Sequence, residues 1–126
     1  MAGKIIADTI ETGAGADIAT NHVVNGSAKA WVNFNGLNTP AARASNNTST
    51  ITDNGTGNYS VAIVNHFATA NYAVSVSASS AGMSNTDTMV NPYVWATHST
   101  SIGTNNNSGT AVDRTYVNFT IHGDLA

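Results

Sequence analysis

The chain has 126 residues, the size of one compact domain. Only 9% of the residues are charged and the formal net charge is −3, so the basic surface that nucleic-acid binding needs is absent. No cysteine is present, which excludes disulfides, thiolate metal sites and cysteine catalysis. No segment approaches the roughly 20 apolar residues of a membrane-spanning helix.

Residues 1–27 differ from the rest of the chain and are predicted to be an attachment or oligomerisation segment. Residues 4–10 are β-prone, residues 13–16 (GAGA) form a flexible break, and residues 18–24 are expected to be a second short strand. The segment has too few large apolar residues to hold a core of its own. We therefore expect it to pair with the main domain, with sister subunits or with another protein.

From residue 28 onward the hydrophobic pattern has a period of two, which is typical of half-buried strands. Ala30, Val32 and Phe34 fall on one face of the first strand, and Trp31 falls on the other. Alternation of the same kind predicts strands over residues 59–63, 72–78 and 116–122, with a weaker strand at 48–52. Residues 90–97 are apolar on both faces, so we expect that strand to be covered twice, for example by a subunit contact.

These short strands, separated by turn signals, predict an all-β fold for residues 28–126. The expected architecture is an antiparallel β-sandwich of jelly-roll type, without a helix of ordinary length. Residues 53–58 (DNGTGN) are the strongest turn, because Asn-Gly supplies the positive φ angles of a tight hairpin. Residues 37–47, 83–88 and 99–109 are expected to be polar loops, where binding usually resides on a β scaffold.

The sequence contains no motif that indicates catalysis. Its seven acidic residues fall mostly in predicted loops, and Asp53 is expected to bond to the backbone of its own turn. The four histidines lack a metal-chelating spacing, and the 53–58 turn lacks the spaced carboxylates of a calcium loop. We therefore predict a non-enzymatic protein with no catalytic residue, no metal site and no cofactor.

Aromatic and amide side chains are the remaining binding candidates. Tyr93 and Trp95 lie on the strand with two apolar faces. Trp31 lies opposite the Ala30, Val32 and Phe34 face, and the pattern leaves open which of these two faces is buried. Such rings stack on sugars, fill a subunit interface, or pack in the core, which is the more common outcome. The predicted binding residues are Trp31, Tyr93 and Trp95, together with Asn105, Asn106 and Asn107 of the 99–109 loop.

Several segments of the first 78 residues resemble a domain of bacteriophage tail-fibre and virion surface proteins, of the type found in marine phages. They are KAWVNF (29–34), ARAS (42–45), TDNGTGNY (52–59) and NYAV (71–74), preceded by KIIADTIE (4–11). The resemblance implies a virion protein, assembled in the host cytoplasm, that forms homotrimers and contacts other virion proteins through residues 1–27. Because relatives often carry a long shaft that this chain lacks, a short virion protein fits better: a tail knob or tip, a head fibre, or a capsid decoration protein.

Three functional readings follow. The first is a short tail structure that attaches to a host receptor or surface polysaccharide through the loops. The second is a capsid decoration protein or head fibre, which the sequence does not separate from the first. The third, from another class, is a soluble carbohydrate-binding module.

Overall fold

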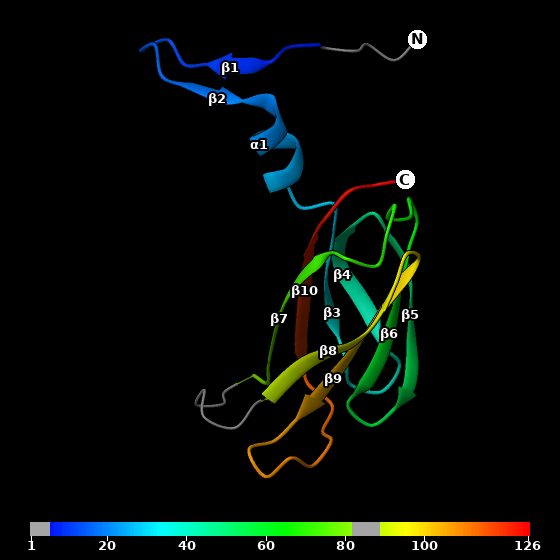
Figure 1. Ribbon diagram of the computed structural model, residues 1–126. Helices are drawn as coiled ribbons and strands as arrows, with labels where there is room; N and C mark the ends of the chain where they lie inside the picture. The colour runs from blue at the N-terminus through cyan, green and yellow to red at the C-terminus, as the bar shows by residue number, and fades with distance from the viewer. Residues whose placement is uncertain (1–5, 82–88) are drawn as a thin grey trace.

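The computed structural model describes residues 6–81 and 89–126. Two four-stranded antiparallel sheets face each other and form a β-sandwich, as the sequence predicted (Figure 1). The first sheet has the order β4-β3-β10-β7, with β3 at Ala30–Asn35, β4 at Ala41–Asn46, β7 at Ala73–Ser79 and β10 at Tyr116–His122. The second sheet has the order β5-β6-β9-β8, with β5 at Thr48–Gly55, β6 at Asn58–Ile63, β8 at Met89–Ala96 and β9 at Ser99–Asn105.

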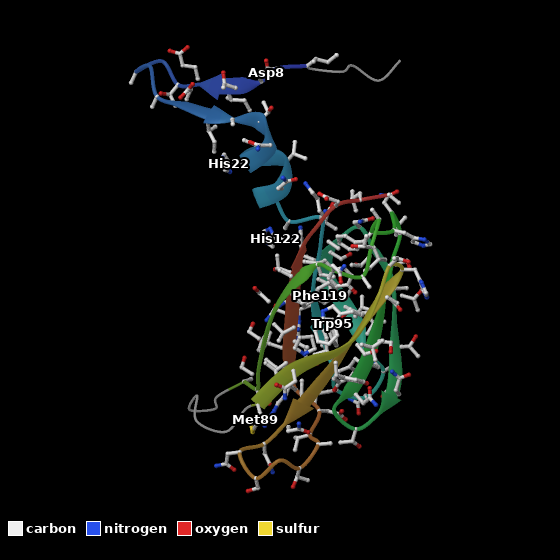
Figure 2. The ribbon with its side chains drawn as sticks, viewed as in Figure 1. Asp8, His22, Met89, Trp95, Phe119 and His122 are labelled. Atoms are coloured by element: carbon white, nitrogen blue, oxygen red, sulfur yellow. The ribbon has the colours of Figure 1, made fainter. Side chains whose placement is uncertain are left out.

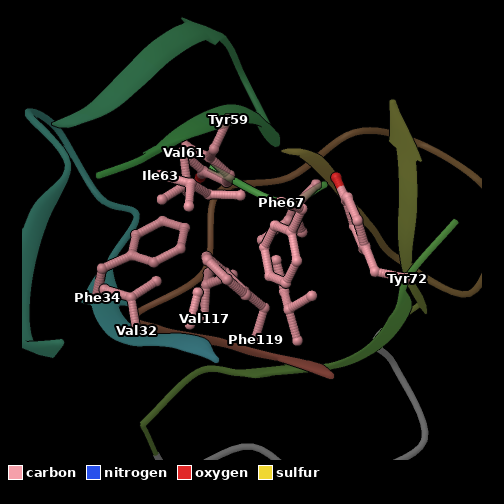
Figure 3. Packing of buried hydrophobic residues seen from close by; sticks show 12 residues of the cluster. Val32, Phe34, Tyr59, Val61, Ile63, Phe67, Tyr72, Val117 and Phe119 are labelled. Atoms are coloured by element: carbon pink, nitrogen blue, oxygen red, sulfur yellow. The ribbon is translucent and has the colours of Figure 1, made fainter. Parts of the chain in front are cut away.

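The core lies between the sheets and consists mostly of the alternating residues that the sequence pattern identified, with Phe67 and Ile102 in addition (Figure 3). Strands β3, β6 and β10 supply most of its buried side chains, namely Ala30, Val32, Phe34, Tyr59, Val61, Ile63, Val117, Phe119 and Ile121. Phe34 and Tyr59 join the two layers through an edge-to-face contact, with ring centroids 5.2 Å apart. Since this apolar set alternates with polar residues, each strand has only one register that buries it.

Three hairpins, β3–β4, β5–β6 and β8–β9, lie within the sheets, and the other connections cross between them. The crossing from β4 to β5 is a single residue, Asn47, with a positive φ of 55°. Its side chain holds the crossing in place, because Nδ2 donates to Lys29 O and Asn65 O while Oδ1 accepts from Asn65 N. Asparagine tolerates this left-handed conformation better than most residues.

The strongest predicted turn is a hairpin, but its geometry differs from the expectation. The turn residues are Thr56 and Gly57. Positive φ angles occur at Gly55 (122°) and Gly57 (65°), whereas Asn54, for which a positive φ was expected, does not have one. A register shift between Asp53 and Gly55 accommodates the extra residue. Asp53 Oδ1 accepts from Gly55 N at 2.8 Å, which confirms the predicted bond within its own turn.

Two predicted loops contain strands, and this is a correction. The 37–47 loop includes β4, whose residues are all exposed at the edge of the first sheet, so no apolar alternation marks it. The 99–109 loop includes β9, a central strand of the second sheet. Thr100 and Thr104 are buried there because their hydroxyls donate to Val94 O and Val112 O, so a polar sequence fills core-facing positions. The third predicted loop, 83–88, lies outside the described residues.

Residues 6–81 and 89–126 do not provide the expected double coverage of residues 90–97. Strand β8 is an edge strand, and its side chains Tyr93, Val94 and Trp95 are exposed. An edge position explains the presence of Pro92, which cannot donate a backbone hydrogen bond to a ladder. Coverage of this strand by another subunit stays a prediction.

The N-terminal segment, residues 6–27, contains a small hairpin and a short helix. Strand β1 at Thr9–Glu11 pairs with β2 at Asp17–Ala19, and α1 follows at Thr20–Gly26. The predicted strand over 18–24 was therefore wrong beyond Ala19. The ladder to β1 ends where Thr20 N donates to Asp8 O, so later residues satisfy their backbone groups in a helical turn.

The N-terminal segment stands apart from the sandwich at one end, as Figure 1 shows. The C-terminus lies at this same end, which we call the proximal end. The opposite, distal end is formed by the connections at residues 36–40, 56–57 and 106–115.

Candidate functional site

The N-terminal segment presents apolar surface without a core beneath it. None of residues 6–27 is buried, and five large apolar side chains are exposed, namely Ile6, Ile10, Ile18, Val23 and Val24. Figure 2 shows the side chains of this segment, including Asp8 and His22, projecting from a hairpin and helix that the sandwich does not cover. A two-stranded hairpin and a helix of 7 residues are each marginal on their own in water.

Polar contacts inside this segment are local. Thr20 Oγ1 donates to Ala7 O at 2.7 Å and to Asp8 O at 3.1 Å, which joins the helix to the hairpin. Ser27 Oγ donates to Val23 O at 2.6 Å and closes the C-terminal end of α1. Lys29 Nζ donates to Val24 O, while Lys29 N donates to Ile121 O of the sandwich at 2.8 Å. The segment thus has a defined shape and a defined exit point from the domain.

Trp31 lies on the outer face of the first sheet, which decides between the two faces that the alternation left open. It is paired with Thr120 of β10 and Asn46 of β4, and its indole is exposed. A row of hydrogen bonds crosses this face beside it, since Asn33 Nδ2 donates to Asn118 Oδ1 and Asn118 Nδ2 donates to Ser77 Oγ. This face therefore combines an aromatic ring with fixed amide groups.

Arg43 lies on the same outer face, and its guanidinium already interacts with other residues of the domain. Its guanidinium lies over the ring of Tyr116, 4.4 Å from the centroid, and Nη2 donates to Thr115 O at 2.7 Å. Such a stacked and hydrogen-bonded arginine fixes the position of β4 relative to β10. We read Arg43 as a structural clamp.

Tyr93 and Trp95 lie on opposite faces of the second sheet. Trp95 pairs with Thr100, a core-facing position, so it belongs to the inner face of the sheet, where it remains exposed. The hydroxyl of Tyr93 donates to Asn58 Oδ1 on the outer face. Neither ring shares a face with Trp31, which belongs to the other sheet. The structure therefore does not bring the three predicted aromatic residues together.

The three predicted asparagines lie at or near the distal end. Asn105 ends β9 and forms a bridge with Ala111. Asn106 organises the following loop, because its Oδ1 accepts from Ser108 N at 3.0 Å and from Thr110 N at 2.9 Å. Asn107 is exposed. Asn106 thus has a structural role, and Asn107 presents its side chain at the distal tip.

Sequence reasoning missed a polar cluster that closes the distal end of the core. Asp113 Oδ1 accepts from the Tyr59 hydroxyl at 2.7 Å and from Gly57 N at 2.6 Å. The same hydroxyl lies 2.9 Å from Gly36 O. Burial, followed by the hydrogen bond to Asp113, raises the pKa of Tyr59 above its ordinary value of 10.0. No spacing signal marks this cluster, since its members come from three separate segments, at residues 36, 57–59 and 113.

Arg114 adds a buried cation to the same end of the domain, and Nη2 donates to Asn105 O at 3.2 Å. We interpret the cluster as a structural closure of the distal end of the sandwich and not as a reaction centre. Each of its hydrogen bonds connects two chain segments at this end. Across residues 6–81 and 89–126, no group of three or more His, Cys, Asp or Glu side chains is placed to hold a metal ion. No helix in the described part of the chain has the length and apolar character to cross a membrane.

Comparisons with known proteins add no relative. No family model, no curated protein and no solved structure matches the chain.

Proposed function

We propose that this protein is a structural component of a bacteriophage particle, attached through its N-terminal segment and projecting its β-sandwich outward. The observation that carries the proposal is the apolar surface of residues 6–27, which buries none of its own residues. Exposed apolar clusters on a folded protein mark interaction sites. The resemblance of the KAWVNF and TDNGTGNY segments to phage fibre and virion surface proteins supplies the class of particle.

The two ends of the sandwich support an orientation in which the domain projects away from its attachment point. The N-terminal segment joins the proximal end, so the distal loops at 36–40 and 106–115 face away from any partner bound there. We assign the protein to a short tail fibre, knob or tip that contacts the host surface. Capsid decoration or a head fibre is the alternative within the particle, since an outward-facing domain suits both positions.

The proposed assembly is a homotrimer whose contacts include residues 6–27. In this arrangement Ile10, Ile18 and Val23 are covered by sister subunits or by another virion protein. Light scattering of the full chain measures the subunit number. The double substitution Ile10→Asn and Val23→Asn is expected to lower it, because both changes place amides in an apolar contact. Val64→Asn is the matched control, since Val64 is 57% exposed on the sandwich.

Labelling of intact particles tests the functional assignment. Antibody-gold against the sandwich is expected at the tail, and label on the head would replace the tail assignment with the decoration alternative. Particles assembled without the protein are expected to lack one density feature. Unchanged particles with no label would refute a virion role.

A carbohydrate-binding module is the candidate from a different class. The observation in its favour is that both sheets carry exposed aromatic rings on their outer faces, with Trp31 on one and Tyr93 on the other. This reading predicts a monomer with sugar affinity and no association with particles. A trimer in light scattering would count against it.

A further inference from the structure

We infer that the outer face of the second sheet holds a platform for a neutral sugar ring, with Tyr93 as the stacking surface and Asn58 and Asn54 as its hydrogen-bonding rim. This inference deepens the proposed host-surface role and rests on it for its biological meaning. The binding itself is a property of the isolated protein.

A β-bulge aims Tyr93 across the sheet. Pro92 pairs with Ile102 and Val94 pairs with Ser101, so Tyr93 is an extra residue in β8 with no partner of its own in β9. Bulges redirect side chains and are common beside binding sites. The Tyr93 hydroxyl reaches Asn58 of β6, two strands away from β8. A side chain that spans this distance lies along the sheet surface instead of standing upright on it.

The Tyr93 ring lies over Gly103 of β9. A Cβ atom placed on Gly103 would lie 3.8 Å from both Cδ1 and Cε1 of Tyr93, so the ring covers this glycine directly. The side chain nevertheless remains 46% exposed. One side of the ring is therefore packed against the sheet, and the other is open to a ligand.

Asn58 supplies hydrogen-bond donors at the edge of this ring. Its Oδ1 accepts from the Tyr93 hydroxyl and from Asn54 Nδ2, the latter at 3.5 Å, which fixes the orientation of the amide. Within the described part of the chain, Asn58 Nδ2 donates to no protein group, and its hydrogens are available to a ligand. Asn54 Nδ2 also donates to Ser60 Oγ at 2.7 Å, which leaves the Asn54 carbonyl oxygen as an acceptor.

The charge of the face selects a neutral ligand. Strands β6, β8 and β9 contain no charged residue. Asp53 is the one charged residue of β5, and it pairs with the core residue Tyr59, so it belongs to the other face of the sheet. A desolvated contact with a carboxylate or phosphate group would find no cation here.

Sugar rings match this arrangement chemically. The C–H face of a pyranose is apolar and stacks on an aromatic ring, while its equatorial hydroxyls both donate and accept hydrogen bonds. A preformed ring flanked by oriented amides binds such a unit with little loss of side-chain entropy.

The experiment uses the full chain and a panel of neutral hexasaccharides of glucose, mannose, galactose and N-acetylglucosamine, with oligogalacturonate as the charged probe. Proton–nitrogen correlation NMR spectra record the chemical shifts of the side-chain amides of Asn54 and Asn58. At least one neutral probe is expected to shift these signals with a Kd of about 1 mM or tighter. Oligogalacturonate is expected to leave them unchanged. Tyr93→Ala is expected to weaken binding about tenfold or more, and Tyr93→Phe less, because it keeps the stacking surface.

Tyr116→Ala is the matched control, because Tyr116 is a similarly exposed tyrosine on the outer face of the other sheet. Equal losses from Tyr93→Ala and Tyr116→Ala would overturn the proposal, and so would the absence of any shift with every neutral probe. A change in subunit number on Tyr93→Ala would instead assign the patch to a subunit contact and overturn it as well. Sugar binding by a protein absent from particles would refute only the virion role.

Discussion

The Tyr59 hydroxyl donates to Asp113 Oδ1 at 2.7 Å, and this bond connects the core to the loop that closes the distal end of the sandwich. The same carboxylate oxygen accepts from Gly57 N in the β5–β6 turn. Tyr59 itself is fully buried and packs edge to face on Phe34. One side chain therefore contributes both to the packing of the two sheets and to the seal at their end.

Replacement of Tyr59 by phenylalanine is expected to destabilise the domain by about 1–3 kcal/mol, because it leaves buried acceptors without their donor. Packing on Phe34 is retained, so the effect isolates the hydroxyl. Urea denaturation measures the change in the free energy of unfolding. Tyr116→Phe is the control, since the structure shows no hydrogen bond from that exposed hydroxyl to the described residues. Equal effects of the two substitutions would contradict the assigned role.

Alkaline pH is expected to weaken the fold through the buried tyrosines. Burial raises the pKa of both Tyr59 and Tyr72 above 10.0, the ordinary value that applies in the unfolded chain. The unfolded state therefore loses these protons first, and the free energy of unfolding falls as the pH rises above about 10. Below that pH their contribution is complete. Denaturation at pH 8 and at higher values is expected to show this decline, with a shallower slope in Tyr59→Phe; identical slopes would refute the attribution to Tyr59.

Asn47 provides a test of the single-residue crossing between the sheets. Asn47→Gly keeps the positive φ of 55° accessible but removes the bonds to Lys29 and Asn65, so we expect a loss of about 1–3 kcal/mol. Asn47→Ala adds the strain of the left-handed conformation and is expected to cost about 1 kcal/mol more. Both values come from thermal or urea unfolding.

Asn38→Gly is the control for Asn47, because Asn38 has a φ of 58° and its side chain makes no hydrogen bond to the described residues. It is expected to leave stability nearly unchanged. If it destabilised the domain as much as Asn47→Gly, the side-chain bonds of Asn47 would not be the cause.

The sequence predicted the parts of this fold that depend on apolar alternation. Val32 and Phe34, and likewise Val117 and Phe119, point inward as their spacing indicated. It failed for β4 and β9, because an exposed edge strand needs no apolar face and because Thr100 and Thr104 occupy core positions with satisfied hydroxyls. The Tyr59–Asp113 pair is separated by 54 residues, and the Tyr93–Asn58 pair depends on a bulge. Neither relationship has a local signal in the chain.

Gly57 offers the sharpest test of the distal seal. Its φ of 65° is unfavourable for a residue with a side chain, and a Cβ atom there would collide with the carbonyl oxygen of Thr104 and lie 2.9 Å from Val112 N. Both neighbours are backbone atoms held in the loop by the bond from Val112 N to Thr104 O, so they cannot move independently. Gly57→Ala is therefore expected to cost about 3 kcal/mol or more, combining backbone strain with overpacking.

Gly109→Ala separates these two causes. Gly109 has a φ of 79°, but a Cβ atom there would meet no other atom within 4 Å. It carries the conformational strain without the collision, so we expect a loss of only about 1 kcal/mol. Paired urea denaturation curves give the difference between the variants directly. If the two alanine substitutions lowered the free energy of unfolding equally, the close approach of Gly57 to Thr104 would not contribute to the loss. The tight packing of the distal end that these contacts indicate would then be contradicted.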